Sequence, residues 1–574
     1  MPEKVVTQFA AEQQQRNQTL QHQMRQLFDP FGLWATTQQA HQAWLAHPQQ
    51  LLEVCGTYNR DLIRLLGFAT RRYWGEPDTD VIPPHPEDPR FADPVWCDSP
   101  YWDSIKELYL LNTRWLQNCL YATPGLNEQQ RSISAFWLRQ WLNALAPTNF
   151  LLTNPNALAT ALETRGESLA KGWQNFLADM ARGDISMTDL SAFKVGENLA
   201  TTPGAVVYRG KLLEVLHFEA NTPTVHKVPL VLVSPWINKY YVLDLNPQKS
   251  MIQYLVDQGF SVFVTSWKNP DASMSEVGLD DYLTDGVAQI IDVACEISGS
   301  DKVNLLGYCI GGTLVTTYLA WANRAQPGKV PVQSATLLTT LTDFARPGDI
   351  EVFIDEDGLD YIDRIMENKG YLDGKDMAAS FRLLRSNSLI WNYWASNYLL
   401  GETPMAFDVL YWNMDTTRMP KCMHHTYLRE LYWHNKLVQP DALTLAGQPI
   451  DLGQITQPIY MVSAEEDHIA PWKQTYTLVE RVAGPVQFTL STSGHIIGII
   501  NPPGPKCKRS YWQGTPTKGA GAEDWLAAQT QVAGSWWPNW VEWLRPQSGN
   551  QVKPKLSSRK HAKLCAAPGT YVLE

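Results

Sequence analysis

The 574-residue sequence predicts an α/β protein with a mostly parallel sheet, a helical cap insertion and an α-helical N-terminal domain. Three observations lead to this prediction. Apolar residues recur at three- and four-residue spacing through residues 1–190, which is typical of amphipathic helices. From residue 191 onward, short β-branched runs alternate with helical patterns and indicate βαβ units. The aromatic-rich residues 343–457 interrupt that alternation, and so long a connection is expected to be a cap.

The N-terminal domain, residues 1–190, is expected to be a helical lobe. Met1–Gln23 lacks the basic start and apolar stretch of a signal peptide, so we expect no export. The proline-dense residues 83–100 are expected to lie extended over the surface. The predicted helices are 40–52, 62–73, 101–119, 133–145 and 157–180.

The catalytic domain, residues 191–574, is expected to begin with two strands joined by a tight turn and to continue with parallel βαβ units. The predicted strands are 205–208, 212–217, 230–233, 261–265, 303–306, 335–340, 459–463 and 486–490. The predicted helices between them include 247–258, 282–298 and 312–325.

A Gly-x-Cys-x-Gly motif follows the predicted strand 303–306 and precedes a helical stretch. A strand that turns sharply into a helix needs small residues two before and two after the turn residue, and Gly307 and Gly311 meet that spacing. The turn presents Cys309 beside a helix N-terminus, which stabilises a thiolate. The motif therefore predicts the nucleophile elbow of an α/β-hydrolase fold. A buried cysteine in a Gly-rich turn is the structural alternative.

A carboxylate and a histidine follow in the chain order expected of a catalytic triad. Asp467 comes after the strand 459–463, where it could orient an imidazole, although Glu465 and Glu466 compete with it. Asp343, after the strand 335–340, is an alternative acid.

Among the twelve histidines, His495 is best placed to act as the base. It follows the strand 486–490, and we expect Gly494 beside it to let the ring approach the elbow closely. His468 is the weaker alternative, because it shares a loop with the predicted acid.

The oxyanion donors are predicted to be backbone amides. One is the amide of Ile310, next to the nucleophile, and the other comes from the loop after the strand 230–233. Since Pro235 has no amide hydrogen, Trp236 or Ile237 is the expected second donor. Alternatively, this loop only turns the chain.

Composition excludes several classes of protein. The net charge of −11 and pI near 5.6 argue against nucleic-acid binding, and the basic tail 553–563 is expected to be a solvated terminal segment. Eight scattered cysteines without a CxxC pair predict reduced thiols and a cytoplasmic protein. Residues 303–323 are uncharged over a membrane-span length, but their glycines and threonines favour a strand, turn and core helix.

The motifs together resemble the class I polyhydroxyalkanoate synthases over most of the chain. The matching motifs are Asp88–Trp96, Asn154-Pro155, Gly166–Leu169, Ile237–Tyr241, Leu243–Leu245, Ser266–Pro270, Gly307–Thr313, Trp391–Tyr393, Asp467–Trp472, Gly494-His495 through Asn501–Pro503, Gly534–Pro538 and Ala567–Tyr571. The resemblance places the family's catalytic residues on Cys309, Asp467 and His495.

The resemblance implies an (R)-3-hydroxyacyl-CoA substrate, a polyester product on the surface of a storage granule, and a homodimer. It implies no metal and no cofactor beyond the CoA that the substrate carries. Substrate contacts are expected from Asn238, Trp391 and His468. Arg385 lies where the family could use an arginine near CoA, although it could equally form an ordinary ion pair in the cap.

Two other functions compete with this interpretation. A thiol-dependent hydrolase, such as a thioesterase or a dienelactone-hydrolase-like enzyme, could use the same triad. A non-catalytic granule-coating protein could use the N-terminal lobe and the Trp-rich residues 525–543 as apolar docking surfaces. The complete triad argues against a purely structural role, and we expect Trp536 and Trp537 to be core residues.

Overall fold

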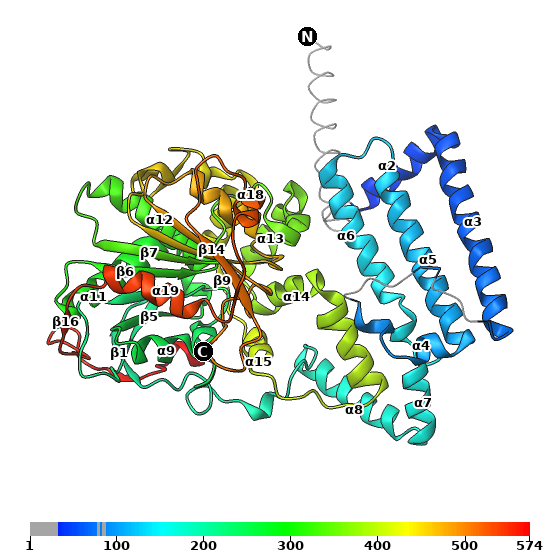
Figure 1. The fold of residues 1–574 in the computed structure, drawn as a ribbon, viewed down its shortest axis with the longest axis horizontal. Helices are drawn as coiled ribbons and strands as arrows, with labels where there is room; N and C mark the ends of the chain where they lie inside the picture. Colours follow the sequence, from blue (N-terminus) through cyan, green and yellow to red (C-terminus); the bar gives the residue numbers. More distant parts are fainter. Residues whose placement is uncertain (1–32, 77–80, 83–87) are drawn as a thin grey trace, which may run out of the picture. The chain divides into compact units, whose positions relative to one another are not determined.

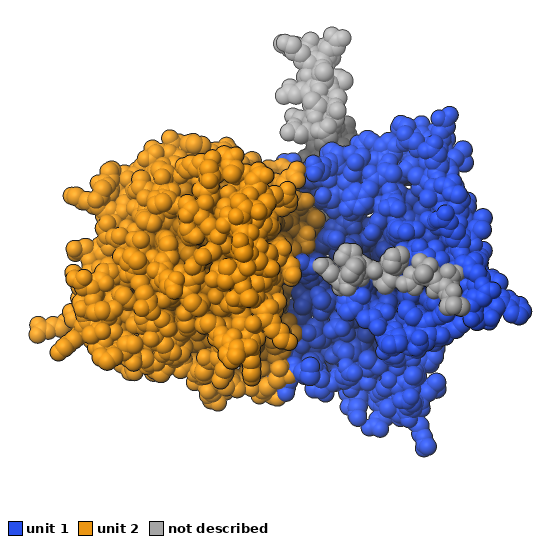
Figure 2. Space-filling model, in the orientation of Figure 1, with its two compact units in different colours: residues 1–189, 355–361, 379–405 blue, residues 190–354, 362–378, 406–574 orange. Residues whose placement is uncertain are grey.

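The computed structural model describes residues 33–76, 81–82 and 88–574 (Figure 1). The prediction for Met1–Gln23 therefore lies outside the described residues. The chain forms two compact units, coloured separately in Figure 2. The first contains residues up to 189 together with 355–361 and 379–405, and the second contains 190–354, 362–378 and 406–574.

The first unit is helical, as its apolar periodicity predicts. Its N-terminal helices are α2 (Leu33–Ala46), α3 (Pro48–Tyr73), α4 (Val95–Asp98), α5 (Pro100–Ala122), α6 (Glu128–Ala144), α7 (Pro155–Glu163) and α8 (Glu167–Arg182). A buried cluster that includes Leu65, Phe68 and Trp96 joins α3, α4 and α5.

Three sequence predictions in this unit are wrong. The helix expected over 40–52 is interrupted at His47, where α2 ends and α3 begins. The single helix expected over 157–180 is broken between α7 and α8, where Arg165 and Gly166 have φ of 53° and 86°. The described part of the proline-dense stretch is not extended, because the 3₁₀ turn Pro89–Phe91 and α4 occupy it. Pro89 is the first residue of the 3₁₀ turn and Pro94 is the N-cap of α4, so a proline stands at the start of each short helix. Residues 83–87 lie outside the described residues.

Part of the predicted cap belongs to the first unit. The segment Trp394–Leu399 packs closely on α8, where a Cβ added to Gly172 would lie 2.0 Å from the carbonyl oxygen of Tyr398. The Tyr398 hydroxyl donates to Asp179 at 2.7 Å, and the Asn175 amide donates to the carbonyl oxygen of Asn397 at 3.0 Å. The insertion 343–457 is thus divided between the two units.

The second unit contains an 11-stranded sheet in the order β15-β14-β13-β12-β7-β6-β4-β5-β2-β1-β17. Strands β5, β4, β6, β7, β12 and β13 are parallel neighbours, and antiparallel strands extend both sides. The strands are β1 (Gly204–Arg209), β2 (Leu213–Phe218), β4 (Leu230–Val233), β5 (Val262–Trp267), β6 (Val303–Tyr308), β7 (Val332–Leu338), β12 (Ile459–Ala464), β13 (Val486–Ser491), β14 (Ser510–Gly514), β15 (Val532–Ala533) and β17 (Cys565–Ala566). All eight predicted strands are present, with ends shifted by a few residues.

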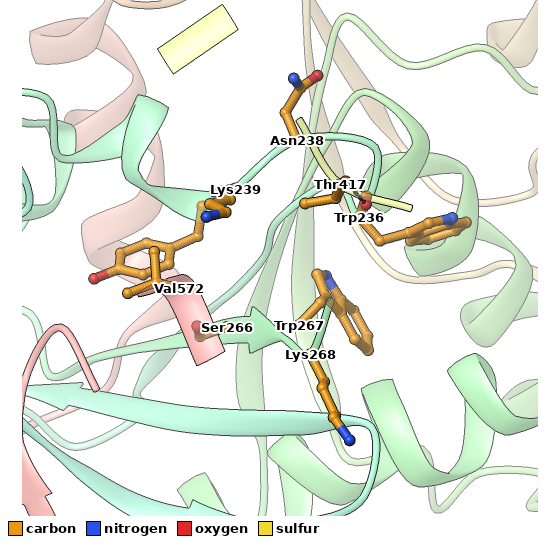
Figure 3. A pocket seen from close by; sticks show the side chains of 9 residues that line it. Trp236, Asn238, Lys239, Ser266, Trp267, Lys268, Thr417 and Val572 are labelled. Atoms are coloured by element: carbon orange, nitrogen blue, oxygen red, sulfur yellow. Dashed lines mark hydrogen bonds between the residues drawn. The ribbon is translucent and has the colours of Figure 1, made fainter. Parts of the chain in front are cut away.

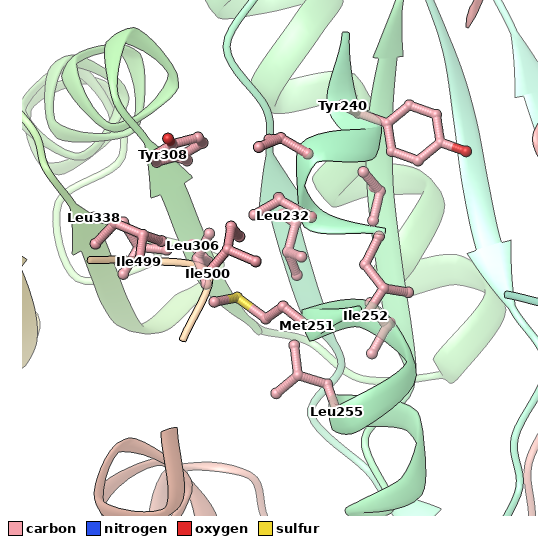
Figure 4. Packing of buried hydrophobic residues seen from close by; sticks show 14 of the residues in the cluster. Leu232, Tyr240, Met251, Ile252, Leu255, Leu306, Tyr308, Leu338, Ile499 and Ile500 are labelled. Atoms are coloured by element: carbon pink, nitrogen blue, oxygen red, sulfur yellow. The ribbon is translucent and has the colours of Figure 1, made fainter. Parts of the chain in front are cut away.

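Helices pack against this sheet and bury its apolar side chains (Figure 4). The principal helices are α9 (Met251–Asp257), the π-helical turn Tyr282–Ala288 with α11 (Gln289–Ser298), α12 (Ile310–Ala325), α15 (Asp408–Met414) and α19 (Trp537–Leu544). The uncharged stretch 303–323 is β6 followed by α12, as predicted. Among the described residues, no helix is both long and apolar enough to cross a membrane.

The Trp-rich segment is core and not a docking surface. Trp536, Trp537 and Trp540 are at most 1% exposed. Their indole N–H groups donate to Gly498, Ile499 and Thr336 respectively. The proposed docking role of these tryptophans is therefore wrong, and the prediction that Trp536 and Trp537 are core residues is confirmed.

The C-terminal tail is anchored to the sheet. Most basic side chains of 553–563 are exposed, as predicted, but β16 (Gln551–Val552) and β17 pair with β3 (Val225–His226) and β1 on either side of them. The buried Glu214 of β2 accepts hydrogen bonds from the amides of Thr570 and Tyr571 at 2.9 and 3.1 Å.

Substitution of Glu214 should release this tail. In the wild type, the amides of Thr570 and Tyr571 donate to the Glu214 carboxylate. In Glu214→Gln they would face an amide N–H₂ group, which is itself a donor. Because a hydrogen bond to a charged group contributes about 1.5–3 kcal/mol, trypsin should cleave within 553–563 at least about tenfold faster than in the wild type. Glu167→Gln, at an exposed surface carboxylate that pairs with Lys171 and not with the tail, is the matched control. Equal cleavage rates in the two variants would show that Glu214 does not hold the tail.

Candidate active site

Cys309 occupies the turn between β6 and α12. Its backbone has φ of 54° and ψ of −124°, a strained conformation for a residue with a side chain. A Cβ added to Gly307 would lie 2.4 Å from the Cα of Gly312, and one added to Gly311 would lie 2.3 Å from the Val233 carbonyl oxygen. Both predicted glycines are therefore sterically required, and the sharp strand-to-helix turn presents the thiol.

His495 connects Cys309 to Asp467. The Nδ1 of His495 lies 2.7 Å from Oδ2 of Asp467, and the charge of Cys309 acts on the pKa of the same imidazole, which places the sulfur near the ring. The other carboxylate oxygen, Oδ1, accepts from the amides of Ile469 and Ala470 at 2.8 and 2.9 Å. Because both oxygens are engaged and the carboxylate is fully buried, its orientation toward His495 is fixed.

The surroundings of His495 favour its protonated form. Burial lowers the pKa of His495. The charges of Asp467 and Cys309 and hydrogen bonding raise it by more than burial lowers it, so the net pKa is well above the ordinary value. A protonated imidazole held by a carboxylate is the form of a catalytic histidine that can donate a proton to a leaving group.

The alternative acids do not bond to His495. Asp343 instead accepts from Asn435 at 2.8 Å and from Arg481 at 2.7 Å. Burial raises the pKa of Asp343, but these hydrogen bonds outweigh burial and leave the pKa below its ordinary value. Glu465 and Glu466 are exposed. The geometry therefore favours Asp467 as the partner of the imidazole.

The geometry does not support His468 as the base, nor the expected need for glycine at position 494. It is the imidazole of His495, and not that of His468, that bonds to Asp467. A Cβ added to Gly494 would meet only the Glu466 carbonyl oxygen, at 3.7 Å, so the close approach of the ring does not require glycine there. Ser493 has the unusual backbone instead, with φ of 83°. That turn, and not a missing side chain, directs His495 toward the elbow.

The segments that carry the predicted oxyanion residues meet beside the elbow. Ile310 is the first residue of α12, and the contacts of Gly311 with Val233 and Ser234 bring this helix end against the end of β4. Trp236 follows in the same loop and is 3% exposed. The roles of Ile310, Trp236 and Ile237 as donors stay predictions.

The remaining predicted contacts fall in both units. Asn238 forms a backbone bridge with Thr416 in the second unit, and His468 follows Asp467 directly. Arg385 is exposed and Trp391 packs on Trp394 in the first unit. Substrate binding by these four residues stays a prediction.

Sequence reasoning missed two tyrosines beside the nucleophile. Tyr427 and Tyr432 belong to the π-helical turn Tyr427–Trp433, and their hydroxyl oxygens are 3.3 Å apart. Burial raises the pKa of both, and the charge of Cys309 raises each further, which places both near the sulfur. Phe344 packs on Tyr432 with ring centroids 4.7 Å apart. In sequence, these residues are indistinguishable from aromatic core.

The elbow is a strand-turn-helix, and the chain order is Cys309, Asp467 and then His495. The three residues follow β6, β12 and β13 respectively. These features define an α/β hydrolase fold. The family model for this fold, described as "alpha/beta hydrolase fold", matches residues 229–502. A second model, "Poly-beta-hydroxybutyrate polymerase (PhaC) N-terminus", matches residues 87–255.

Curated relatives match across both units. A poly(3-hydroxyalkanoate) polymerase of Methylorubrum extorquens is 40% identical over 92% of this chain and 88% of its own length. The polymerase subunit PhaC of Rhizobium meliloti is 39% identical over 94% and 88%, and that of Cupriavidus necator is 42% identical over 84% and 83%. The chain belongs to the poly(3-hydroxyalkanoate) polymerase family, whose members are acyltransferase-type enzymes.

Proposed function

We propose that this protein polymerises (R)-3-hydroxyacyl-CoA, with a short acyl chain such as 3-hydroxybutyryl, into polyester and releases CoA. The observation that carries this proposal is the His495 imidazole bonded to Asp467 and close to the elbow residue Cys309, in a chain of the polymerase family. The proposed chemistry needs no metal and no cofactor other than the CoA that enters and leaves with the substrate.

The first step transfers the acyl group to sulfur. The thiolate of Cys309, whose proton is held by His495, attacks the thioester carbonyl carbon, and backbone amides at Ile310 and in the loop after β4 stabilise the oxyanion. The carbon–sulfur bond to CoA then breaks, and the CoA thiolate takes the proton from His495. Because one thioester replaces another, the acyl group keeps its activation.

The second step extends the chain. His495 accepts the proton of a 3-hydroxyl group, and that oxygen attacks the acyl-enzyme to form an oxoester, which is lower in energy than the thioester. Cys309 leaves as the thiolate, with His495 protonated again. Asp467 orients the imidazole and stabilises its charge, and through His495 it assists deprotonation of the hydroxyl.

Exclusion of water distinguishes a polymerase from a hydrolase that uses the same triad. Phe344, Tyr427 and Tyr432 are each at most 8% exposed and pack on one another, and the two tyrosines lie close enough to Cys309 to feel its charge. A dry site slows hydrolysis of the acyl-enzyme, so that a hydroxyl group delivered by the substrate reacts first. This enclosure favours chain growth over a thiol hydrolase.

We further propose that the enzyme acts as a cytoplasmic homodimer at the surface of a polyester granule. This part of the proposal rests on the sequence resemblance. A concentration series by analytical ultracentrifugation, with and without substrate, measures the dimer.

Product analysis tests the polymerase directly. With 3-hydroxybutyryl-CoA, we expect most acyl groups to enter insoluble polyester and only a minor fraction to become free 3-hydroxybutyrate. Chromatography of the soluble acid, and of the polymer after hydrolysis, measures both fractions against total CoA released. Free acid as the dominant product would contradict the proposal and leave a thiol hydrolase.

A further inference from the structure

The loop that follows β4, residues 234–238, is fixed to the sheet at its first residue. The amide of Ser234 donates to the Thr265 hydroxyl oxygen at 2.9 Å, and the Ser234 hydroxyl donates to the Thr265 carbonyl at 2.9 Å. The indole N–H of Trp267 donates to the Ser234 carbonyl at 2.8 Å. Both partners belong to β5, so this end of the loop is as rigid as the sheet.

The other end of the loop is held by residues outside the sheet. The Thr417 hydroxyl is 2.7 Å from the carbonyl oxygen of Trp236 and 2.5 Å from that of Ile237, and its hydrogen is shared between them. Thr417 is 7% exposed, so water does not compete strongly for these carbonyls. Trp236 and Thr417 line the same small pocket (Figure 3).

The residues before Thr417 contact the same stretch of chain. The indole N–H of Trp412 donates to the carbonyl oxygen of Lys239 at 2.7 Å. Asp415 lies 2.8 Å from the Lys239 ammonium and accepts from the Tyr241 hydroxyl at 2.8 Å. The segment 412–417 thus binds the loop and its continuation at several successive residues.

Planarity of the peptide bond makes these contacts relevant to the oxyanion site. In a trans peptide, the carbonyl oxygen and the following N–H lie in one plane and point in opposite directions, so fixing one fixes the other. A hydrogen bond to the Trp236 carbonyl therefore sets the direction of the Ile237 N–H. The Trp236 N–H lies between the carbonyl that Thr417 binds and the anchored Ser234. Trp236 and Ile237, the two candidates for the second oxyanion donor, are therefore held in place from both ends of the loop.

We propose that Thr417 is a positioning residue that aligns the oxyanion loop 234–238 for catalysis. The inference rests on the proposed acyl transfer at Cys309, but not on the fate of the acyl group. Thr417 acts through backbone carbonyls and contacts no reacting atom. An oxyanion donor is effective only when it is already aligned with the developing charge, so a loosened loop should slow the chemical step more than substrate binding.

Thr417→Val tests this role, because valine keeps the shape of threonine and removes the hydroxyl. Removing a whole oxyanion donor costs about 10²–10³ in kcat, so misaligning one should lower kcat for CoA release by about ten- to a hundredfold. KM should change by less than about threefold, because the substitution leaves the contacts that bind substrate and transition state equally well unchanged. Thr417→Ser restores the hydroxyl and should recover most of the rate.

The neighbouring Thr416 supplies a matched control. Its backbone bridges Asn238, but no hydrogen bond joins its hydroxyl to the loop within the described residues, so Thr416→Val should behave as the wild type. Trp412→Phe examines the clamp through a second contact, because it removes the N–H that bonds Lys239, together with part of a buried ring. It should lower kcat in the same direction by a smaller factor, again with little change in KM.

Wild-type kcat in Thr417→Val would overturn the inference. So would a loss of rate in Thr417→Val that Thr417→Ser does not recover, or one that raises KM as much as it lowers kcat. If Thr417→Val has a lower thermal midpoint than the wild type, its loss of rate cannot be assigned to loop alignment, and kcat and KM of Trp412→Phe decide the test. CoA release is common to a polymerase and a thioester hydrolase, so product analysis that contradicts chain growth would leave this test intact.

Discussion

Cys309→Ala is expected to abolish CoA release from 3-hydroxybutyryl-CoA while the protein stays folded. Without the sulfur atom no acyl-enzyme can form, and loss of a nucleophile costs on the order of 10⁶ in kcat. The elbow should survive, because alanine is smaller than cysteine and the crowded positions are Gly307 and Gly311. Free thiol released over time, measured with a thiol reagent, gives the rate.

Cys309→Ser should be nearly as damaging. A hydroxyl is far harder to deprotonate than a thiol, and the site is arranged around a larger sulfur atom. Cys295→Ala, in α11, is the control for a cysteine outside the elbow and should keep the wild-type rate. Turnover near that of the wild type by Cys309→Ala would remove this residue from the mechanism. A mass increase of one acyl group on wild-type protein, absent from Cys309→Ala, would identify the thioester.

The parallel strands and the elbow could be predicted because their signals are local. A buried parallel strand is a short apolar run, and the elbow's steric requirement appears as glycine at two fixed positions around Cys309. The edge strands β14, β15 and β17 were missed. They are short, their side chains are partly exposed, and pairing with distant strands, not their own pattern, makes them strands.

Long-range packing also explains why the cap could not be divided from the sequence. An aromatic, helical pattern shows that a segment is buried, but not which partner buries it. Gly172 lets α8 approach the backbone of Tyr398, and that contact assigns part of the insertion to the first unit. Tyr427, Tyr432 and Thr417 were missed for the same reason, since their importance depends on neighbours far away in the sequence.

The choice of acid illustrates what tertiary contacts add. Asp343 and Asp467 both follow parallel strands, and their local sequences do not decide between them. Arg481 and Asn435 engage Asp343 in an ion pair and a hydrogen bond, which satisfies its carboxylate without a histidine. Asp467 instead uses one oxygen for backbone amides and directs the other at His495.

Asp467→Asn should lower kcat by about three to four orders of magnitude, as expected for an imidazole in the wrong tautomer. The asparagine carbonyl oxygen would keep accepting from the amides of Ile469 and Ala470, which places its N–H₂ group against Nδ1 of His495. Nδ1 must then accept a hydrogen bond, so the ring carries its proton on Nε2 and cannot take one from Cys309. The variant also removes a negative charge that raises the pKa of His495, so any remaining activity should depend on an imidazole with a lower pKa.

Asp343→Asn is the matched control for the acid. It removes the charge that pairs with Arg481 and should lower the thermal midpoint, but it should change kcat by less than about tenfold, because no step passes through that carboxylate. Steady-state CoA release and its pH profile, measured for both variants beside the wild type, decide the assignment. A large loss in Asp343→Asn with near-normal turnover in Asp467→Asn would mean that the acid follows β7. The hydrogen bond between Asp467 and His495 would then serve only to hold the loop.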